Sequence, residues 1–199
     1  MRQLEIQNSK PDLEPGTRPK GALVSLFGLL PSQNFYIRID LFPVKLRFLW
    51  IGKTKDPLLL KVEDKYLKRI EQHLPVQKTV VRDFKKSDPH QQEAQLEREA
   101  KHIERHLSRK TYLAVLDSMG EELTSPQLAS SLADLMNRGV SEVTFLVGSH
   151  LGIPQRIKKV ANLKLSLTKL TLPHELARVV LLEQIYRAVT IIKGLPYHK

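Results

Sequence analysis

The chain has 199 residues and no cysteine, and its 32 lysines and arginines against 21 aspartates and glutamates give a formal charge of +11. This length suits one ordinary domain with a short appendage. The missing cysteines exclude a disulfide framework, a thiolate zinc site, an iron–sulfur cluster and a catalytic thiol. The charge favours a polyanionic partner. No apolar run reaches the ~20 residues of a membrane span, and the short run at 22–30 lacks a cleavage site, so we expect a cytoplasmic protein.

Residues 1–43 differ from the rest of the chain. They hold five of the twelve prolines, and no helical or strand period persists in them. We therefore expect an irregular N-terminal extension. Residues 44–199 carry 27 basic against 17 acidic side chains, so the excess positive charge belongs to this part.

Strand and helix patterns alternate from residue 45 onward. Alternating or continuous apolar residues predict strands, and apolar residues three and four apart predict helices. The expected elements, in chain order, are a strand at 45–51, a helix over 57–74, a strand at 76–81, a helix from 88 to 107, a strand at 112–116, a helix over 125–137, a strand at 143–147, a helix over 154–160, a strand at 164–167 and a helix over 174–192. This alternation indicates an α/β domain with a mostly parallel sheet between helices.

Three segments follow predicted strands and are candidates for a binding site, because ligands of parallel sheets bind at the carboxyl ends of the strands. They are Leu116–Asp117, Gly148–Gly152 and Leu167–Pro173. The glycines of the second segment allow close backbone approach to a ligand. The segment is neither a GxGxxG fingerprint nor a phosphate-binding loop, so a purely structural turn explains it equally well.

The last predicted helix is apolar almost all round between residues 176 and 192, which predicts burial on more than one side. We expect one side to pack on the sheet and the other on a second subunit of a homodimer. Glu183 and Arg187 lie four residues apart on it. An internal ion pair or a dimer contact is the favoured interpretation, and the alternative is that Arg187 faces a substrate phosphate or the ligand.

His102 and His106 are spaced one helical turn apart, as two zinc ligands can be. Charged residues surround them and no third ligand is evident. A solvated helix face is therefore the better interpretation, and no metal is expected.

Four C-terminal segments together resemble the RlmH family, the bacterial 23S rRNA (pseudouridine-N3) methyltransferases of the SPOUT class. They are Ser166–His174 (SLTKLTLPH), Arg178, Glu183–Ala188 (EQIYRA) and Pro196–Lys199 (PYHK). The resemblance covers residues 44–199 and is densest over the final 60. It implies an α/β fold whose C-terminal part threads into a deep trefoil knot, an exception to the rule against knots, and a dimer paired across that knot.

The resemblance also implies a cofactor and a substrate. S-adenosylmethionine would be bound in a bent shape by three loops, through Leu116, Gly148, Leu167, Thr168, Lys169, Leu170, Thr171 and Leu172. Family members act on a pseudouridine in helix 69 of 23S rRNA, within the assembled 70S ribosome. The imide nitrogen of that base must lose a proton before it accepts the methyl group. His174, Tyr197 and His198 are candidates to accept the proton, and Arg187 is a candidate to stabilise the anion.

Two features depart from the family pattern. Ser149 stands where the family usually has a second glycine, and residues 1–43 have no family counterpart. Val44 occupies the position at which family members start, so the extension is either a mis-assigned upstream start or a genuine arm.

Two rival functions stay open, a non-catalytic ribosome-associated RNA-binding factor with the same fold and a small-nucleotide-binding enzyme. Ser149 favours the first, and the missing phosphate loop disfavours the second.

Overall fold

The computed structural model describes residues 24–25, 36–37, 44–83 and 92–197. Within the extension, strands β1 (Val24–Ser25) and β2 (Tyr36–Ile37) form a short antiparallel pair. The sequence pattern predicts no strand there, because a pairing two residues long leaves no periodic pattern.

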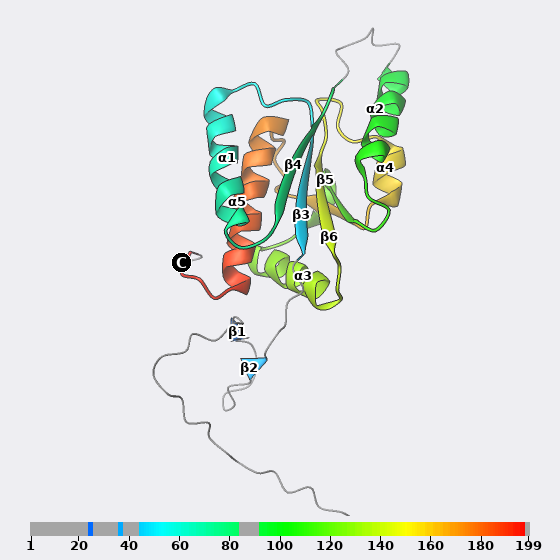
Figure 1. Cartoon of the computed structure of the whole chain (residues 1–199). Coiled ribbons are helices and arrows are strands. Elements are labelled where there is room, and N and C mark those ends of the chain that lie inside the picture. Colours follow the sequence, from blue (N-terminus) through cyan, green and yellow to red (C-terminus); the bar gives the residue numbers. More distant parts are fainter. Residues whose placement is uncertain (1–23, 26–35, 38–43, 84–91, 198–199) are drawn as a thin grey trace, which may run out of the picture.

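Five parallel strands form the central sheet of the domain (Figure 1). They are β3 (Lys45–Ile51), β4 (Val76–Val81), β5 (Tyr112–Glu122), β6 (Glu142–Val147) and β7 (Leu163–Ser166), in the spatial order β4-β3-β6-β5-β7. The predicted α/β fold with a parallel sheet is confirmed. The trefoil knot that the resemblance implies stays a prediction.

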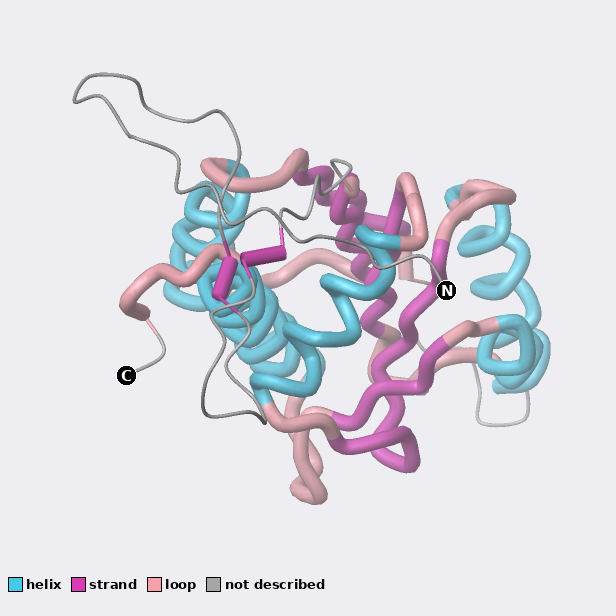
Figure 2. Tube along the Cα trace, turned by 90° about the horizontal axis from the view of Figure 1, so that it is seen from below, coloured by secondary structure: helices cyan, strands magenta, loops and turns pink. Residues whose placement is uncertain are grey.

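Five helices cover the two faces of this sheet (Figure 2). They are α1 (Pro57–Glu71), α2 (Gln92–His106), α3 (Ser125–Asn137), α4 (Gln155–Val160) and α5 (His174–Ile192). Helices α1, α3 and α5 pack on one face over Phe48 and Trp50. Helices α2 and α4 pack on the other face over Leu49 and Ile51. None of these helices, which are all that the described ranges contain, is long and apolar enough to cross a membrane.

Within the described residues, two boundaries, the end of α1 and the end of β5, differ from the expected ones by more than one residue. Helix α1 ends at Glu71 and not at residue 74. The predicted start of the next helix, at residue 88, lies outside the described residues, and α2 is described from Gln92. Strand β5 continues six residues beyond the predicted end at Leu116, after a register shift against β7 that resumes with Glu121 opposite Leu165. The polar segment after Leu116 has the composition of a turn, and only its pairing with a distant strand makes it extended.

The long helix α5 lies between α1 and α3 (Figure 1). Its buried residues include Leu181, Leu182, Ile185 and Val189. Part of the apolar circumference that we expected to face a second subunit therefore packs inside the same chain. Leu176, at the start of the helix, remains 38% exposed.

Candidate functional site

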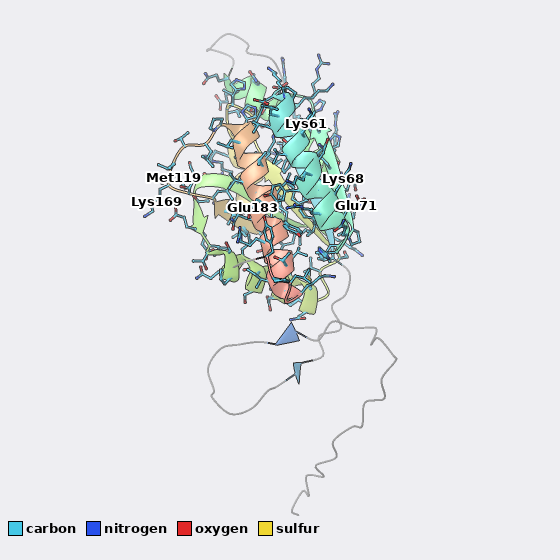
Figure 3. The ribbon with its side chains drawn as sticks, turned by 90° about the vertical axis from the view of Figure 1, so that its left-hand side faces the viewer. Lys61, Lys68, Glu71, Met119, Lys169 and Glu183 are labelled. Carbon is cyan, nitrogen blue, oxygen red and sulfur yellow. The ribbon has the colours of Figure 1, made fainter. Side chains whose placement is uncertain are left out.

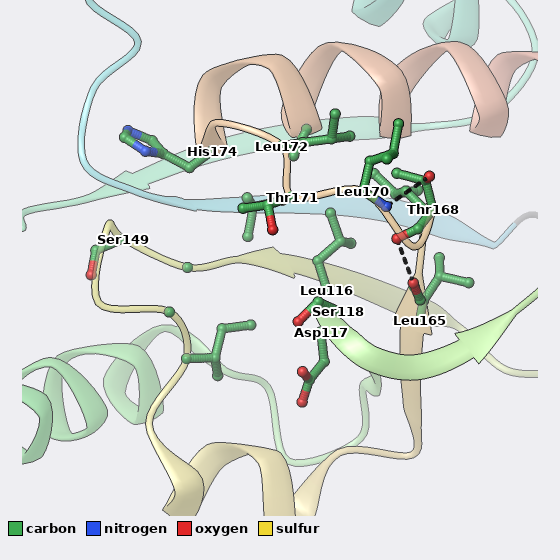
Figure 4. Close-up of a pocket in the computed structure, with 17 residues that line it drawn as sticks. Leu116, Asp117, Ser118, Ser149, Leu165, Thr168, Leu170, Thr171, Leu172 and His174 are labelled. Atoms are coloured by element: carbon green, nitrogen blue, oxygen red, sulfur yellow. Dashed lines mark hydrogen bonds between the residues drawn. The ribbon is translucent and has the colours of Figure 1, made fainter.

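A pocket of about 220 Å³ lies at the carboxyl ends of β5, β6 and β7 (Figure 4). The three strand-end segments that the sequence singled out meet in it. Its lining includes seven of the eight residues that the resemblance assigns to the cofactor, together with one candidate proton acceptor: Leu116, Gly148, Leu167, Thr168, Leu170, Thr171, Leu172 and His174. The eighth, Lys169, is exposed outside this lining. The sequence thus located the pocket, while the binding role of these residues stays a prediction.

The turn from Gly148 to Gly152 forms one wall of the pocket. The backbone N–H of Gly152 donates to the carbonyl oxygen of Ser149 at 3.0 Å, and these two residues form a β-bridge. A Cβ atom added at Gly148 would lie 2.5 Å from the carbonyl oxygen of Gly152, and Gly152 has φ +81°. Both glycines are therefore required by the turn itself. The two interpretations of this segment, structural turn and pocket wall, are compatible.

The extension of β5 supplies a second wall through Asp117 and Ser118. Asp117 forms an ion pair with Lys158 of α4 at 2.8 Å and accepts the N–H of Met119 at 3.2 Å. The hydrogen bond from Lys158 lowers the pKa of the Asp117 carboxyl, so this group is charged at neutral pH. Asp117 belongs to a strand-end segment that the sequence singled out, whereas Ser118 was not predicted as a site residue. Their position directly after a buried strand was the signal that marks them.

The segment between β7 and α5 forms the third wall. Ser166 donates its hydroxyl to the carbonyl oxygen of Thr168 at 3.1 Å, and Thr168 Oγ1 accepts the N–H of Leu170 at 3.1 Å. These local bonds fold the loop back over the strand end, as the dashed lines in Figure 4 show. The side chain of Leu170 is 73% exposed at this loop.

His174 begins helix α5 and reaches the pocket. Burial lowers the pKa of its imidazole, and the nearby positive charge of Arg178 lowers it further. The ring is therefore neutral at pH 7 and has a nitrogen lone pair available. The next residue, Glu175, accepts the backbone N–H groups of Lys55 and Asp56 at 3.1 Å each. This contact fixes the start of α5, and with it His174, against the loop before α1.

Arg187 and Tyr197 form a separate cluster near the C-terminus. Arg187 pairs with Glu183 at 2.6 Å, which confirms the internal ion pair, and its guanidinium lies 5.0 Å from the centre of the Tyr197 ring. The Tyr197 hydroxyl lies 3.4 Å from that of Tyr66 and donates to Glu183 at 3.4 Å. The hydrogen bond with Tyr66, followed by burial, raises the pKa of Tyr197 to about 12. The phenol is therefore protonated at neutral pH and acts as a donor in this cluster.

One chain does not bring the four candidate catalytic residues together. His174 lies in the pocket and Arg187 is thirteen residues further along the same helix. At 1.5 Å per residue, this separates their backbones by about 20 Å. Tyr197 accompanies Arg187, and His198 lies outside the described residues.

The histidine pair on α2 makes a different contact from metal ligation. The ring Nδ1 of His106 lies 2.8 Å from the carbonyl oxygen of His102, one turn earlier. Over the part of the chain that the structure describes, no group of three His, Cys, Asp or Glu side chains is arranged to hold a metal ion.

Comparisons with known proteins assign the chain to a family. The family model described as "Predicted SPOUT methyltransferase" matches residues 44–198. A protein of Methanococcus maripaludis is 40% identical over 152 residues, which cover 75% of this chain and 96% of that protein. The "Ribosomal RNA large subunit methyltransferase H" of Geobacter metallireducens is 37% identical over 155 residues, covering 78% of this chain and 99% of the relative. The protein of the same name from Maridesulfovibrio salexigens is 37% identical over 154 residues, covering 77% and 97%.

These matches span the sheet, its five helices and all three walls of the pocket. They also agree with the resemblance carried by the C-terminal segments. The chain therefore belongs to the SPOUT methyltransferases, within their RlmH family.

Proposed function

We propose that this protein is an S-adenosylmethionine-dependent methyltransferase that modifies N3 of a pseudouridine in helix 69 of 23S rRNA, on the assembled ribosome in the cytoplasm. The observation that supports this proposal most is that the carboxyl ends of β5, β6 and β7 meet in one pocket, in a chain of this family. The names of the relatives support an rRNA substrate. Residues 44–199 are proposed as the methyltransferase domain and residues 1–43 as an extension to it.

The pocket suits the proposed cofactor. Its lining combines leucine and isoleucine side chains with hydroxyl groups and a glycine turn, and its one acidic side chain is neutralised by Lys158. Such a lining fits an adenosine and a methionine chain better than a polyphosphate. When bound, S-adenosylmethionine supplies an activated methyl group for direct displacement. The walls at Leu116, Gly148 and Leu172 would hold it there.

Among the candidate acceptors that the structure describes, the neutral imidazole of His174 is the one that lies at the pocket, and we assign the imide proton to it. It lies at the pocket and its pKa is lowered, so it is an acceptor at physiological pH. Positioning contributes most to such a displacement, because no covalent intermediate with the protein is needed. The contact of Glu175 with the loop before α1 keeps His174 in place.

The substrate side is proposed to come from a second copy of the chain. Arg187 and Tyr197 are outside the pocket lining of their own chain, and Arg187 lies ten residues, or about 15 Å of helix, beyond the lining residue Ala177. Two exposed apolar side chains lie at or next to the pocket lining: Leu170, which is 73% exposed, and Met119, which follows the lining residue Ser118 and is 89% exposed. Figure 3 shows Met119 and Lys169 on one side of α5 and Glu183 on α5 itself. A symmetric dimer that covers this surface would bring the Arg187 cluster of one subunit toward the pocket of its partner.

The experiment uses purified protein, radiolabelled S-adenosylmethionine and 70S ribosomes that lack helix 69 methylation. RNase mapping and mass spectrometry then locate the label. Label at the helix 69 pseudouridine supports enzyme, cofactor and substrate together. If no label is incorporated while an active RlmH enzyme labels the same ribosomes, the methyltransferase proposal is wrong and the non-catalytic factor takes its place. Residues 44–199 are tested beside the full chain, and equal activity would make the extension dispensable.

A further inference from the structure

The hydroxyl of Ser149 is committed to contacts inside the fold. Ser149 is buried in the pocket wall, and its Oγ donates to Glu99 Oε2 at 3.1 Å. The same oxygen accepts the backbone N–H of Leu151 at 3.2 Å, across the turn. Figure 4 shows Ser149 to one side of the lining residues Leu116 and Thr171. Its side chain therefore serves the shape of the turn and leaves the ligand space free.

Glu99 provides a rigid anchor for this hydroxyl. It lies on α2 and is only 1% exposed, although α2 is otherwise a strongly charged helix. Its other oxygen, Oε1, accepts the side-chain amide of Gln95 at 3.3 Å. The neighbouring residues Ala100 and Ile103 are fully buried against the sheet, so the backbone that carries Glu99 is fixed by core packing. Burial of a carboxylate is costly unless its oxygens are hydrogen-bonded, and these two bonds meet that need.

We propose that Ser149 and Glu99 are positioning residues for the cofactor pocket, a role that rests on the proposed function. The turn that they hold contains two glycines, and such a segment samples many backbone conformations when nothing constrains it. The bond from Ser149 to Glu99 holds the turn in its binding shape before the cofactor arrives. Less conformational entropy is then lost on binding, and the affinity is higher. Serine at this position is thus compatible with cofactor binding, because the hydroxyl faces α2.

Variants at the two positions test this role. Ser149→Ala removes the donor to Glu99 and the acceptor for Leu151, and it should raise the dissociation constant for S-adenosylmethionine about tenfold. Glu99→Ala should have a similar effect, and the double variant should lose less affinity than the sum of the two single losses, because each single change already removes the bond between Ser149 and Glu99. Glu99→Gln keeps an oxygen that can accept from Ser149, so its affinity should lie within about threefold of the unmodified protein.

Thr144→Val is the matched control. Thr144 is fully buried on β6, five residues before Ser149, and its hydroxyl hydrogen-bonds to that of Thr111 at 2.7 Å. This variant loses a buried hydroxyl–hydroxyl hydrogen bond in the same sheet, but Thr144 is not part of the pocket lining. It should therefore leave the affinity for S-adenosylmethionine unchanged, whatever its effect on stability.

Two measurements on the full chain test the positioning role of Ser149 and Glu99. Isothermal titration calorimetry gives the affinity for S-adenosylmethionine, and hydrogen–deuterium exchange without ligand gives the protection of residues 148–152. Faster exchange and weaker binding in Ser149→Ala, with Glu99→Gln and Thr144→Val close to the unmodified protein, support the proposal. Unchanged affinity in Ser149→Ala, in a protein that does bind, overturns it even if Glu99→Ala fails to fold. If the unmodified protein does not bind S-adenosylmethionine, the proposed function is wrong and this role is lost with it.

Discussion

The guanidinium of Arg178 donates a hydrogen bond of 2.7 Å to the carbonyl oxygen of Ile51, 127 residues earlier in the chain. A second bond of 2.8 Å reaches Thr54 Oγ1, and the cation lies 5.8 Å from the centre of the Trp50 ring. The fully buried carboxylate of Glu63 accepts from Trp50 and Thr54 in the same network. This network joins the first turn of α5 to the carboxyl end of β3, directly beside the pocket.

Replacement of Arg178 by methionine should lower the free energy of unfolding by about 3 kcal/mol. The change leaves the Ile51 carbonyl oxygen and the Thr54 hydroxyl without their donor, while the buried Glu63 keeps its ion pair with Lys78 at 3.6 Å. The loss of hydrogen bonds from a buried cation exceeds that of a surface ion pair. Urea denaturation followed by circular dichroism measures the effect. The control is Arg138→Met, because Arg138 pairs with Asp134 on an exposed helix surface. We expect a change within about 0.5 kcal/mol there, and equal losses in the two variants would contradict the anchoring role.

Gly120→Ala should destabilise the β5 extension. The added Cβ atom would lie 2.5 Å from the Lys164 carbonyl oxygen, and backbone at that distance must move apart. We expect a loss of about 2 kcal/mol or more in urea denaturation. Gly139→Ala is the comparison, because Gly139 has φ +72° with no atom within 4 Å of the added Cβ. It should lose about 1 kcal/mol from backbone strain alone. A smaller loss at Gly120 than at Gly139 would show that the two strands can separate at little cost.

His174 should titrate below the ordinary histidine value of 6.5, because burial and the charge of Arg178 lower its pKa. The neutral form is the one that the fold favours, so this residue reduces stability as the pH falls through the range below 6.5. Proton NMR of the imidazole, assigned with His174→Gln, measures the midpoint. The methylation rate should fall at low pH as His174 becomes protonated. The variant His174→Gln should lose this fall at low pH together with most of the activity. The control His102→Gln should keep both. A midpoint above 6.5 would contradict the prediction.

Tyr197 should ionise only near pH 12, because its hydrogen bond with Tyr66 and its burial raise the pKa. The folded state favours the protonated phenol. Its contribution to stability is therefore present below pH 10 and is lost as the pH rises toward 12. The difference in tyrosinate absorbance at alkaline pH between the unmodified protein and Tyr197→Phe reports this ionisation. A difference already complete at pH 10 would show that the cluster does not hold the phenol.

Binding to ribosomes should weaken strongly with salt. The excess positive charge lies in residues 44–199, and contacts of lysine and arginine with phosphates release counterions on binding. Filter binding between about 50 and 200 mM monovalent salt should show at least a tenfold loss of affinity. A flat response would contradict an RNA partner.

Much of the fold could be predicted from the sequence, because its strands and helices follow clear periodicities. The strand at Lys45–Ile51 and the helix at His174–Ile192 match the expected bounds, and the pocket lies where three strand ends meet. The extension of β5 was missed, because its pairing of Glu121 with Leu165 depends on a strand more than 40 residues away. Glu99 was missed for a similar reason. It is one of several charged residues in a polar helix, and only tertiary packing distinguishes it as buried.

The edge position of β7 has a consequence for the synthesis of the protein. Leu163–Ser166 is the last of the described strands to be made, and among these strands it pairs with β5 alone. Until it emerges, the backbone groups along one side of β5 have no partner, and an open strand edge is a site of association between chains. Chains truncated before residue 163 should therefore aggregate and cannot form the pocket. Binding of the cofactor would consequently report that synthesis of the chain has passed Ala177, the last residue of the pocket lining.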